Sequence, residues 1–156
     1  MKFNFSKLIP SLLLPIVVGA SSGFLTFDNI DNWYINLTKP PLTPPTWVFG
    51  PVWFVIYLLI GLSLYLFWDN RKKINKKPGY LIYIFSLVSN FLWAFLFFGI
   101  KSPYFAFVDI IILIALIIAN MHYFRQVSKN SALLLLPYLL WVCFATYLNL
   151  GILFLN

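Results

Sequence analysis

Charge is what this sequence most lacks. Only 10% of its 156 residues are charged, whereas a soluble domain carries roughly 25%. Hydrophobic residues make up 62% of the chain and the mean hydropathy is +0.88. This shortage of charge excludes a soluble globular protein and indicates a membrane protein. The length allows one compact unit, so residues 1–156 are expected to form a single membrane domain.

Cysteine and histidine are almost absent as well. Cys143 is the single cysteine and His122 the single histidine. One cysteine excludes an internal disulfide, and the two residues together cannot supply an ordinary metal site. The sequence also has no paired carboxylates, glycine-rich phosphate loop or nucleophile–base set, which argues against ordinary hydrolases and transferases. We therefore expect no metal and no obligatory cofactor.

Long apolar runs dominate what is present. A transmembrane helix needs about 20 apolar residues, and the strands of a membrane β-barrel would be shorter and alternating. The sequence therefore predicts an all-α integral membrane protein, a five-helix bundle joined by mostly short connections. A cleaved signal peptide is the alternative for the first run, but four more spans follow it. The predicted spans are residues 8–27, 48–68, 80–100, 104–123 and 132–155.

The net charge of +7 is distributed unevenly. Nine of the eleven basic residues fall before the first span or in the second and fourth connections, which alternate onto one side. The positive-inside rule then predicts a cytoplasmic N-terminus and an outside C-terminus, in a bacterial plasma membrane. Contact with anionic lipid headgroups accounts for these charges, so no nucleic-acid partner is expected. The nine are Lys2, Lys7, Arg71, Lys72, Lys73, Lys76, Lys77, Arg125 and Lys129.

The first connection, residues 28–46, is rich in proline and aromatic residues. Prolines restrict their own backbone and that of the preceding residue, and Trp33, Tyr34 and Trp47 offer apolar surface to bury. Asp31 is expected to cap a short helical turn over Trp33 and Tyr34. The pattern predicts a structured lid over the bundle mouth, with an interfacial aromatic belt as the alternative. The predicted lid residues are Lys39, Pro40, Pro44, Pro45 and Trp47.

Three span faces combine large aromatic residues with small or polar ones. Such faces favour the bundle interior over a lipid-facing surface. They predict either plain helix packing or a cavity for a flat apolar ligand that stacks on indole rings and bonds to Asn90 or Tyr57. The faces consist of Trp53 and Tyr57; Asn90, Trp93 and Phe97; and Trp141, Ala145 and Leu148, with Asn149 one turn beyond Ala145.

Single residues add four expectations. Asp109 is the only acid within a span, so it is interpreted as a structural anchor or as a proton or cation site. Ser102 and Pro103 fit the start of the fourth helix. Pro137 frees the carbonyl of Leu133 and can kink the fifth span. The Gly19/Gly23 pair permits close helix contact.

Motifs along the whole chain resemble the TspO/MBR family, which includes the peripheral benzodiazepine receptor. The most specific block is KP-x-x-x-PP-x-W-x-x-GPVW, from Lys39 to Trp53. The resemblance continues in order to the end of the chain. It is carried by Trp33-Tyr34, Leu37, the Lys39–Trp53 block, Tyr57, Asn90, Trp93, Phe97-Phe98, Ala106, Asp109, Pro137-Tyr138, Trp141, Phe144-Ala145 and Leu148-Asn149.

This resemblance implies a five-helix bundle, often a homodimer, with a ligand pocket closed by the first connection. It implies a receptor-like protein that binds porphyrins such as protoporphyrin IX and haem, and isoquinoline or benzodiazepine-type molecules, for tetrapyrrole sensing or stress response. Alternatives are a transporter of porphyrins or other apolar ligands that uses Asp109, and a light-dependent porphyrin-degrading enzyme with Trp53 and Trp141 as catalytic candidates. The pocket residues implied by position are Trp33, Trp53, Asn90, Trp93, Trp141, Ala145 and Leu148.

The chain departs from the family pattern in three places. Pro41 and Leu42 replace a serine and an aromatic residue that often follow Lys-Pro. Ile60 replaces a common methionine. Residues 148–152 lack the tyrosine and basic residue of the animal sterol pattern, so sterol recognition by that route is not expected.

Overall fold

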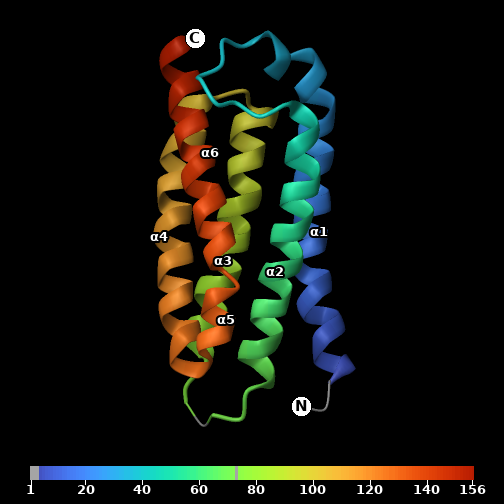
Figure 1. Cartoon of the computed structure of the whole chain (residues 1–156), viewed down its shortest axis with the longest axis vertical. Coiled ribbons are helices and arrows are strands. Elements are labelled where there is room, and N and C mark those ends of the chain that lie inside the picture. The colour runs from blue at the N-terminus through green and yellow to red at the C-terminus, as the bar shows by residue number, and fades with distance from the viewer. Residues whose placement is uncertain (1–3, 73) are drawn as a thin grey trace.

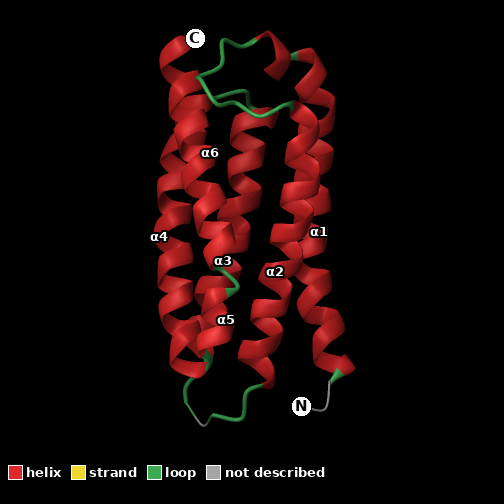
Figure 2. Cartoon of the chain, viewed as in Figure 1, coloured by secondary structure: helices red, strands yellow, loops and turns green. Residues whose placement is uncertain are grey.

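The computed structural model describes residues 4–72 and 74–156, and within them it contains helices and turns but no strand. Five helical stretches are long and apolar enough to cross a membrane, which confirms the predicted all-α, multi-pass membrane fold (Figures 1 and 2). The α-helices are α1 Phe5–Asn32, α2 Phe49–Asp69, α3 Lys77–Ala94, α4 Pro103–Val127, α5 Lys129–Leu133 and α6 Leu136–Leu155. Short helical turns cover η1 Tyr34–Asn36, η2 Thr46–Val48 and η3 Phe95–Gly99.

The helices run side by side, and the chain ends lie at opposite ends of the bundle (Figure 1). Helix α1 packs mainly on α2, while α4 packs on both α3 and α6. The first connection passes over one end of the bundle, above the ends of α2, α3 and α6 (Figure 2). This connection and helices α1, α2, α3 and α6 surround the space in which a ligand site can form.

The first helix is longer than the sequence predicts. It runs to Asn32, so Asp31 lies inside α1 and does not cap the following turn, whose N-cap residue is Trp33. The side-chain amides of Asn29 and Asn32 donate to the carbonyls of Leu25 and Asp28, four residues back. These polar side chains therefore bond along the helix rather than ending it, and the lid begins later than residue 28.

The fifth span is divided in two. Helix α5 ends at Leu133 and α6 begins at Leu136, with Pro137 in its first turn. Because a proline has no N–H for the carbonyl four residues earlier, the predicted interruption at this point is confirmed. The predicted fourth connection is in turn reduced to Ser128, between α4 and α5, and the Ser128 side chain caps α5.

Two local predictions have different outcomes. The Ser102 side chain accepts from the Phe105 N–H, with Pro103 opening α4, as predicted. The close helix contact predicted at Gly19 and Gly23 is found only at Gly19. A Cβ at Gly19 would meet the Tyr57 ring, whereas a Cβ at Gly23 would meet nothing within 4 Å. The backbones of α1 and α2 also come close at Gly61, where a Cβ would lie 2.8 Å from the Cα of Leu12.

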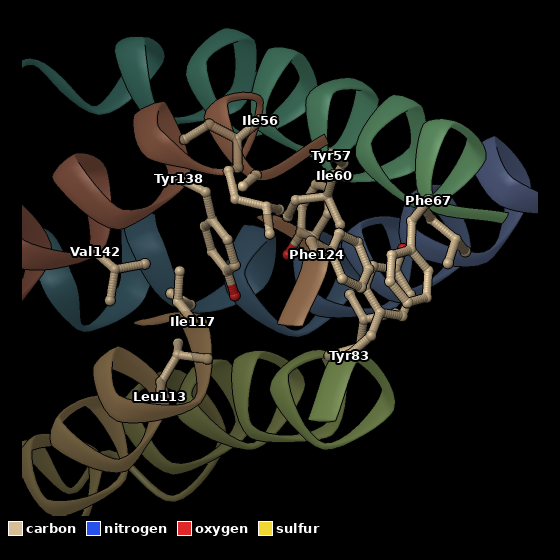
Figure 3. Packing of buried hydrophobic residues seen from close by; sticks show 14 of the residues in the cluster. Ile56, Tyr57, Ile60, Phe67, Tyr83, Leu113, Ile117, Phe124, Tyr138 and Val142 are labelled. Atoms are coloured by element: carbon tan, nitrogen blue, oxygen red, sulfur yellow. The ribbon is translucent and has the colours of Figure 1, made fainter. Parts of the chain in front are cut away.

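An aromatic stack fixes the lower half of the bundle, between α2, α3 and α4. Phe67 stacks on Phe124 with ring centroids 4.1 Å apart, and Tyr83 lies 6.0 Å beyond, nearly parallel (Figure 3). All three side chains are fully buried. Gly79 leaves room for the Phe67 ring, since a Cβ there would lie 2.6 Å from it. This packed half leaves the opposite half of the bundle to hold a cavity.

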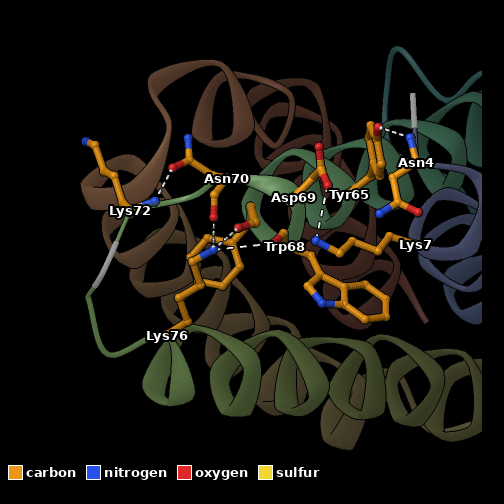
Figure 4. Close-up of polar contacts among 9 residues, drawn as sticks. Asn4, Lys7, Tyr65, Trp68, Asp69, Asn70, Lys72 and Lys76 are labelled. Carbon is orange, nitrogen blue, oxygen red and sulfur yellow. Dashed lines mark hydrogen bonds and ion pairs between the residues drawn. The ribbon is translucent and has the colours of Figure 1, made fainter. Parts of the chain in front are cut away.

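The N-terminal end of the bundle is held by polar contacts (Figure 4). Lys7 pairs with Asp69 at 3.1 Å. The Lys76 ammonium donates to the carbonyls of Phe67, Trp68 and Asn70, which satisfies the C-terminal end of α2. Of the predicted basic side, Lys2 and Lys73 lie outside the described residues. The orientation of the bundle in its membrane stays a prediction.

Candidate ligand cavity

A cavity of about 600 Å³ lies between α1, α2, α3 and α6, below the first connection. Its size is within the roughly 300–1,000 Å³ of small-molecule sites. Aromatic side chains from α2, α3, η3 and α6 make up much of its lining: Phe49, Trp53, Phe54, Tyr57, Trp93, Phe97, Phe98 and Trp141. Small residues of α1, namely Gly19, Ala20, Ser22, Gly23 and Thr26, form most of the opposite wall.

Two tryptophans meet at one side of the cavity. Trp53 stacks on Tyr57 with ring centroids 5.5 Å apart, because residues four apart share a helix face. The Trp141 ring lies edge-on to Trp53 at 6.5 Å and 88°. The Phe49 ring lies edge-on to the Trp141 ring, with ring centroids 6.1 Å apart. Flat and edge-on indole surfaces of this kind suit a planar aromatic ligand.

A third tryptophan is oriented by a buried amide. The Trp93 indole N–H donates to the Asn149 Oδ1 at 3.1 Å, and the Asn149 amide donates to the Pro103 carbonyl at 2.8 Å. Trp93 also stacks on Phe97 at 5.5 Å. The π-helical turn at 95–99 buries both Phe97 and Phe98. Asn149 is thus a positioning residue, which the sequence pattern placed on this face of the fifth span but did not include among the predicted ligand contacts.

Polar atoms in the cavity wall are few. The Tyr57 hydroxyl donates to the Asn90 Oδ1 at 2.5 Å. The Asn90 Nδ2 and the Trp141 Nε1 are buried and have no hydrogen-bond partner within the described residues. Burial raises the pKa of Tyr34, so its hydroxyl at the outer end of the cavity stays protonated at neutral pH. The lining residues Asn90 and Trp141 therefore each hold a buried, unpaired N–H donor within a largely apolar wall.

Most of the residues predicted as ligand contacts line this cavity, and their ligand roles stay predictions. Trp33 lies behind the wall, with its ring 5.5 Å from Phe97. Asp109 is buried on α4, outside the cavity lining, where one oxygen accepts from the Ser89 hydroxyl. Those that line it are Trp53, Tyr57, Asn90, Trp93, Phe97, Trp141, Ala145 and Leu148, together with Trp47 of the predicted lid.

The first connection is seated on α6. The Thr38 backbone and the Asn156 side-chain amide exchange two hydrogen bonds, of 2.9 and 3.0 Å. The Tyr147 hydroxyl donates to the Pro41 carbonyl at 2.8 Å. Pro40 is buried against Gly151. The segment thus has the contacts of a structured lid.

Other lid residues shape the ends of the segment. The Lys39 ammonium donates to the carbonyls of Ile35 and Leu37 and lies 5.0 Å from the Tyr34 ring centroid. Pro44 and Pro45 lead into η2, for which Pro45 is the N-cap residue. Leu42, one of the departures from the family pattern, adopts φ 67° with an exposed side chain, a conformation uncommon for a branched residue.

A substitution at Gly151 is expected to loosen the lid. A Cβ at this position would lie 2.5 Å from the Pro40 ring, so Gly151→Val should displace the ring from α6. Hydrogen exchange of the amides in residues 37–43 should then rise roughly tenfold, equivalent to about 1.4 kcal/mol of lost protection. Leu150→Val, which introduces the same residue next to it, is the control. Equal exchange in both variants would show that Pro40 does not hold the lid.

Comparisons with known proteins agree with the fold. The profile of the TspO/MBR family matches residues 11–155. Tryptophan-rich protein TspO of Archaeoglobus fulgidus is 42% identical over 153 residues, covering 98% of this chain and 99% of that protein. Its counterpart of the same name from Chlorobaculum tepidum is 38% identical over 144 residues, covering 92% and 91%.

Similarity extends to animal proteins. The translocator protein of Ovis aries is 37% identical over 139 residues, covering 85% of this chain and 82% of that protein. The profile match spans nearly the whole chain, including the lid, the aromatic walls and Asn149. The chain therefore belongs to the TspO/MBR family.

Proposed function

We propose that this protein is a membrane receptor that binds tetrapyrroles such as protoporphyrin IX or haem in the cavity between α1, α2, α3 and α6. Membership of the TspO/MBR family supports a receptor-like role in a membrane. The observation that carries the proposal is the combination of planar aromatic walls with two unpaired N–H donors. Isoquinoline carboxamides and benzodiazepine-type molecules, which carry planar aromatic rings and a carbonyl group, fit the same chemistry.

Binding rests on the division of the cavity into apolar and polar parts. The indole faces of Trp53 and Trp141 offer stacking and edge contacts to a macrocycle. The Asn90 Nδ2 and Trp141 Nε1 can donate to a carboxylate or carbonyl oxygen of the ligand, which satisfies donors that are otherwise buried and unpaired. A receptor that senses tetrapyrrole supply would use this occupancy as its signal.

A light-dependent porphyrin-degrading activity is a second candidate. Trp53 and Trp141 both line the cavity and lie 6.5 Å apart, so either indole could donate an electron to an excited bound macrocycle, with dioxygen as the final oxidant. Transport driven through Asp109 has less support, because Asp109 lies outside the cavity lining. We further propose that the protein forms a homodimer in a bacterial plasma membrane, with the N-terminus of each protomer in the cytoplasm.

Titration of the purified protein with protoporphyrin IX tests this function. Occupancy should quench tryptophan fluorescence in a saturable manner, because Trp53, Trp93 and Trp141 all border the cavity. An isoquinoline carboxamide added afterwards should displace the porphyrin and restore the fluorescence. Quenching that never saturates, or that the competitor does not reverse, would contradict specific binding. Illumination of the complex tests the light-dependent degrading activity, which requires that bound porphyrin bleach faster than free porphyrin.

A further inference from the structure

The wall of the cavity is closed on two sides and open on a third. Every lining residue contributed by α3, η3 and α6 is buried or half-buried. On α1 and at the start of the second span, by contrast, several residues line the cavity and are also exposed on the outer surface. These residues define a slot: Ala20, Gly23, Phe27 and Asp31 from α1, and Thr46, Trp47, Gly50 and Phe54 from η2 and α2.

Helical spacing places these residues in two facing stripes. Positions 20, 23, 27 and 31 share one face of α1, and positions 47, 50 and 54 share one face of the second span. A Cβ added at Gly23 or at Gly50 would meet no atom within 4 Å. The stripes therefore do not close against each other, and the slot is open at its middle.

The slot ends where the two helices touch. At Gly19 a Cβ would collide with the Tyr57 ring, and at Gly61 it would lie 2.8 Å from the Ser11 carbonyl oxygen and the Leu12 Cα. One helical turn further along α1, a Cβ at Gly23 would meet no atom within 4 Å. Helices α1 and α2 are thus in contact toward the N-terminal end of the bundle and apart toward the lid.

Lipid is the solvent that this slot faces. Both stripes belong to helices long and apolar enough to cross a membrane. The surface around the slot is aromatic: Phe24, Phe27 and Phe54 are 78%, 77% and 58% exposed. Such a surface is suited to acyl chains. Asp31 and Thr46 supply polar groups at the outer end, where an amphiphilic molecule keeps its polar part.

The other route to the cavity passes under the lid, and this structure holds the lid against α6. The lid is bonded to α6 through Thr38 and Asn156 and through Tyr147 and Pro41, and its Pro40 is buried. We propose that the ligand enters and leaves the cavity laterally, from the bilayer, through the slot between α1 and α2. The slot follows from the geometry alone, and only the identity of the ligand rests on the proposed function.

Exchange kinetics in lipid nanodiscs test this route. Gly23→Leu places a branched side chain in the open middle of the slot, where its Cβ would meet no atom within 4 Å. The association and the dissociation rate constants of protoporphyrin IX, followed by its Soret absorbance, should both fall by about fivefold or more. Ser21→Leu adds the same side chain to an exposed position of α1 that does not line the cavity, and its rates should match those of the unaltered protein.

Whether the dissociation rate constant falls or rises in Gly23→Leu distinguishes a blocked slot from a crowded cavity. A leucine that merely crowded the ligand would raise the dissociation rate constant, and that result would overturn the proposal. Entry under the lid would also overturn it, and would appear as faster exchange in Tyr147→Phe with both rates unchanged in Gly23→Leu.

A measurement without porphyrin keeps the slot testable if the proposed function fails. If protoporphyrin IX does not bind the unaltered protein, the ligand assignment is wrong, but the opening of the slot to the bilayer is still to be decided. Crystals grown in lipid with dibrominated acyl chains should then show bromine scattering between Gly23 and Gly50. Bromine around the bundle but absent from the slot would contradict an opening to the bilayer.

Discussion

Replacing both Trp53 and Trp141 by phenylalanine is expected to weaken protoporphyrin IX binding by roughly 30- to 100-fold. The two indoles form the corner of the cavity, 6.5 Å apart and nearly perpendicular. Each replacement removes ring area, and Trp141→Phe also removes an unpaired N–H donor. Losses of about 1 to 1.5 kcal/mol per indole add to about 2 to 3 kcal/mol, and every 1.4 kcal/mol is tenfold in affinity.

The affinity is best followed by the Soret absorbance of the porphyrin, since the variant lacks two of the fluorescent reporters. Trp68→Phe is the matched control, because Trp68 lies at the other end of α2, away from the cavity. The control should bind as the unaltered protein does. Equal affinities for the double variant and the control would show that stacking in this corner contributes nothing.

A single methyl group at Gly61 is expected to destabilise the bundle by about 1 to 3 kcal/mol. The added Cβ would lie 2.8 Å from backbone atoms of Ser11 and Leu12, and backbone cannot move aside as a flexible side chain would. Helices in membranes associate largely through such close backbone approaches at small residues. Gly61→Ala should therefore lower the midpoint of thermal unfolding in detergent by several degrees.

The same change at Gly23 is expected to have the opposite sign. A Cβ there meets nothing within 4 Å, so Gly23→Ala gains the helix propensity of alanine, up to about 1 kcal/mol. The pair of variants separates helix contact from a general effect of glycine. Equal destabilisation of both would contradict the description of α1 and α2 as touching at Gly61 and apart at Gly23.

The fold could be predicted from the sequence because its main signals are local. Uninterrupted apolar runs indicate the spans whatever their neighbours are, and Ser102-Pro103 specifies the start of α4 within four residues. Helical spacing also predicted that Trp53 and Tyr57 share a face of one helix, and that Asn90 and Trp93 share a face of another. The local signals were wrong about a helix end: Asp31 was predicted to cap a short turn, yet it lies inside α1, where Asn29 and Asn32 bond back along the helix.

The remaining features depend on residues distant in the chain. The partner of Trp93 is Asn149, 56 residues away, and no periodicity reveals that pairing. The slot depends on the distance between α1 and α2, which Gly61 sets from one end. Asp109 stands out in the sequence because an acid in a span is rare, but its position facing Ser89 follows only from the packing of α3 against α4.

A structure of the protein with protoporphyrin IX, determined in a lipid bilayer, tests the central claim most directly. The predicted result is a macrocycle inside the cavity, against Trp53 and Trp141, with an oxygen of the ligand within hydrogen-bond distance of the Asn90 Nδ2. A second groove lies on the outside of α2 and α6, lined by Val52, Val55, Leu140 and Phe144 among others, with Trp141 as the shared wall. A macrocycle seated in that outer groove, with the inner cavity empty, would contradict the account.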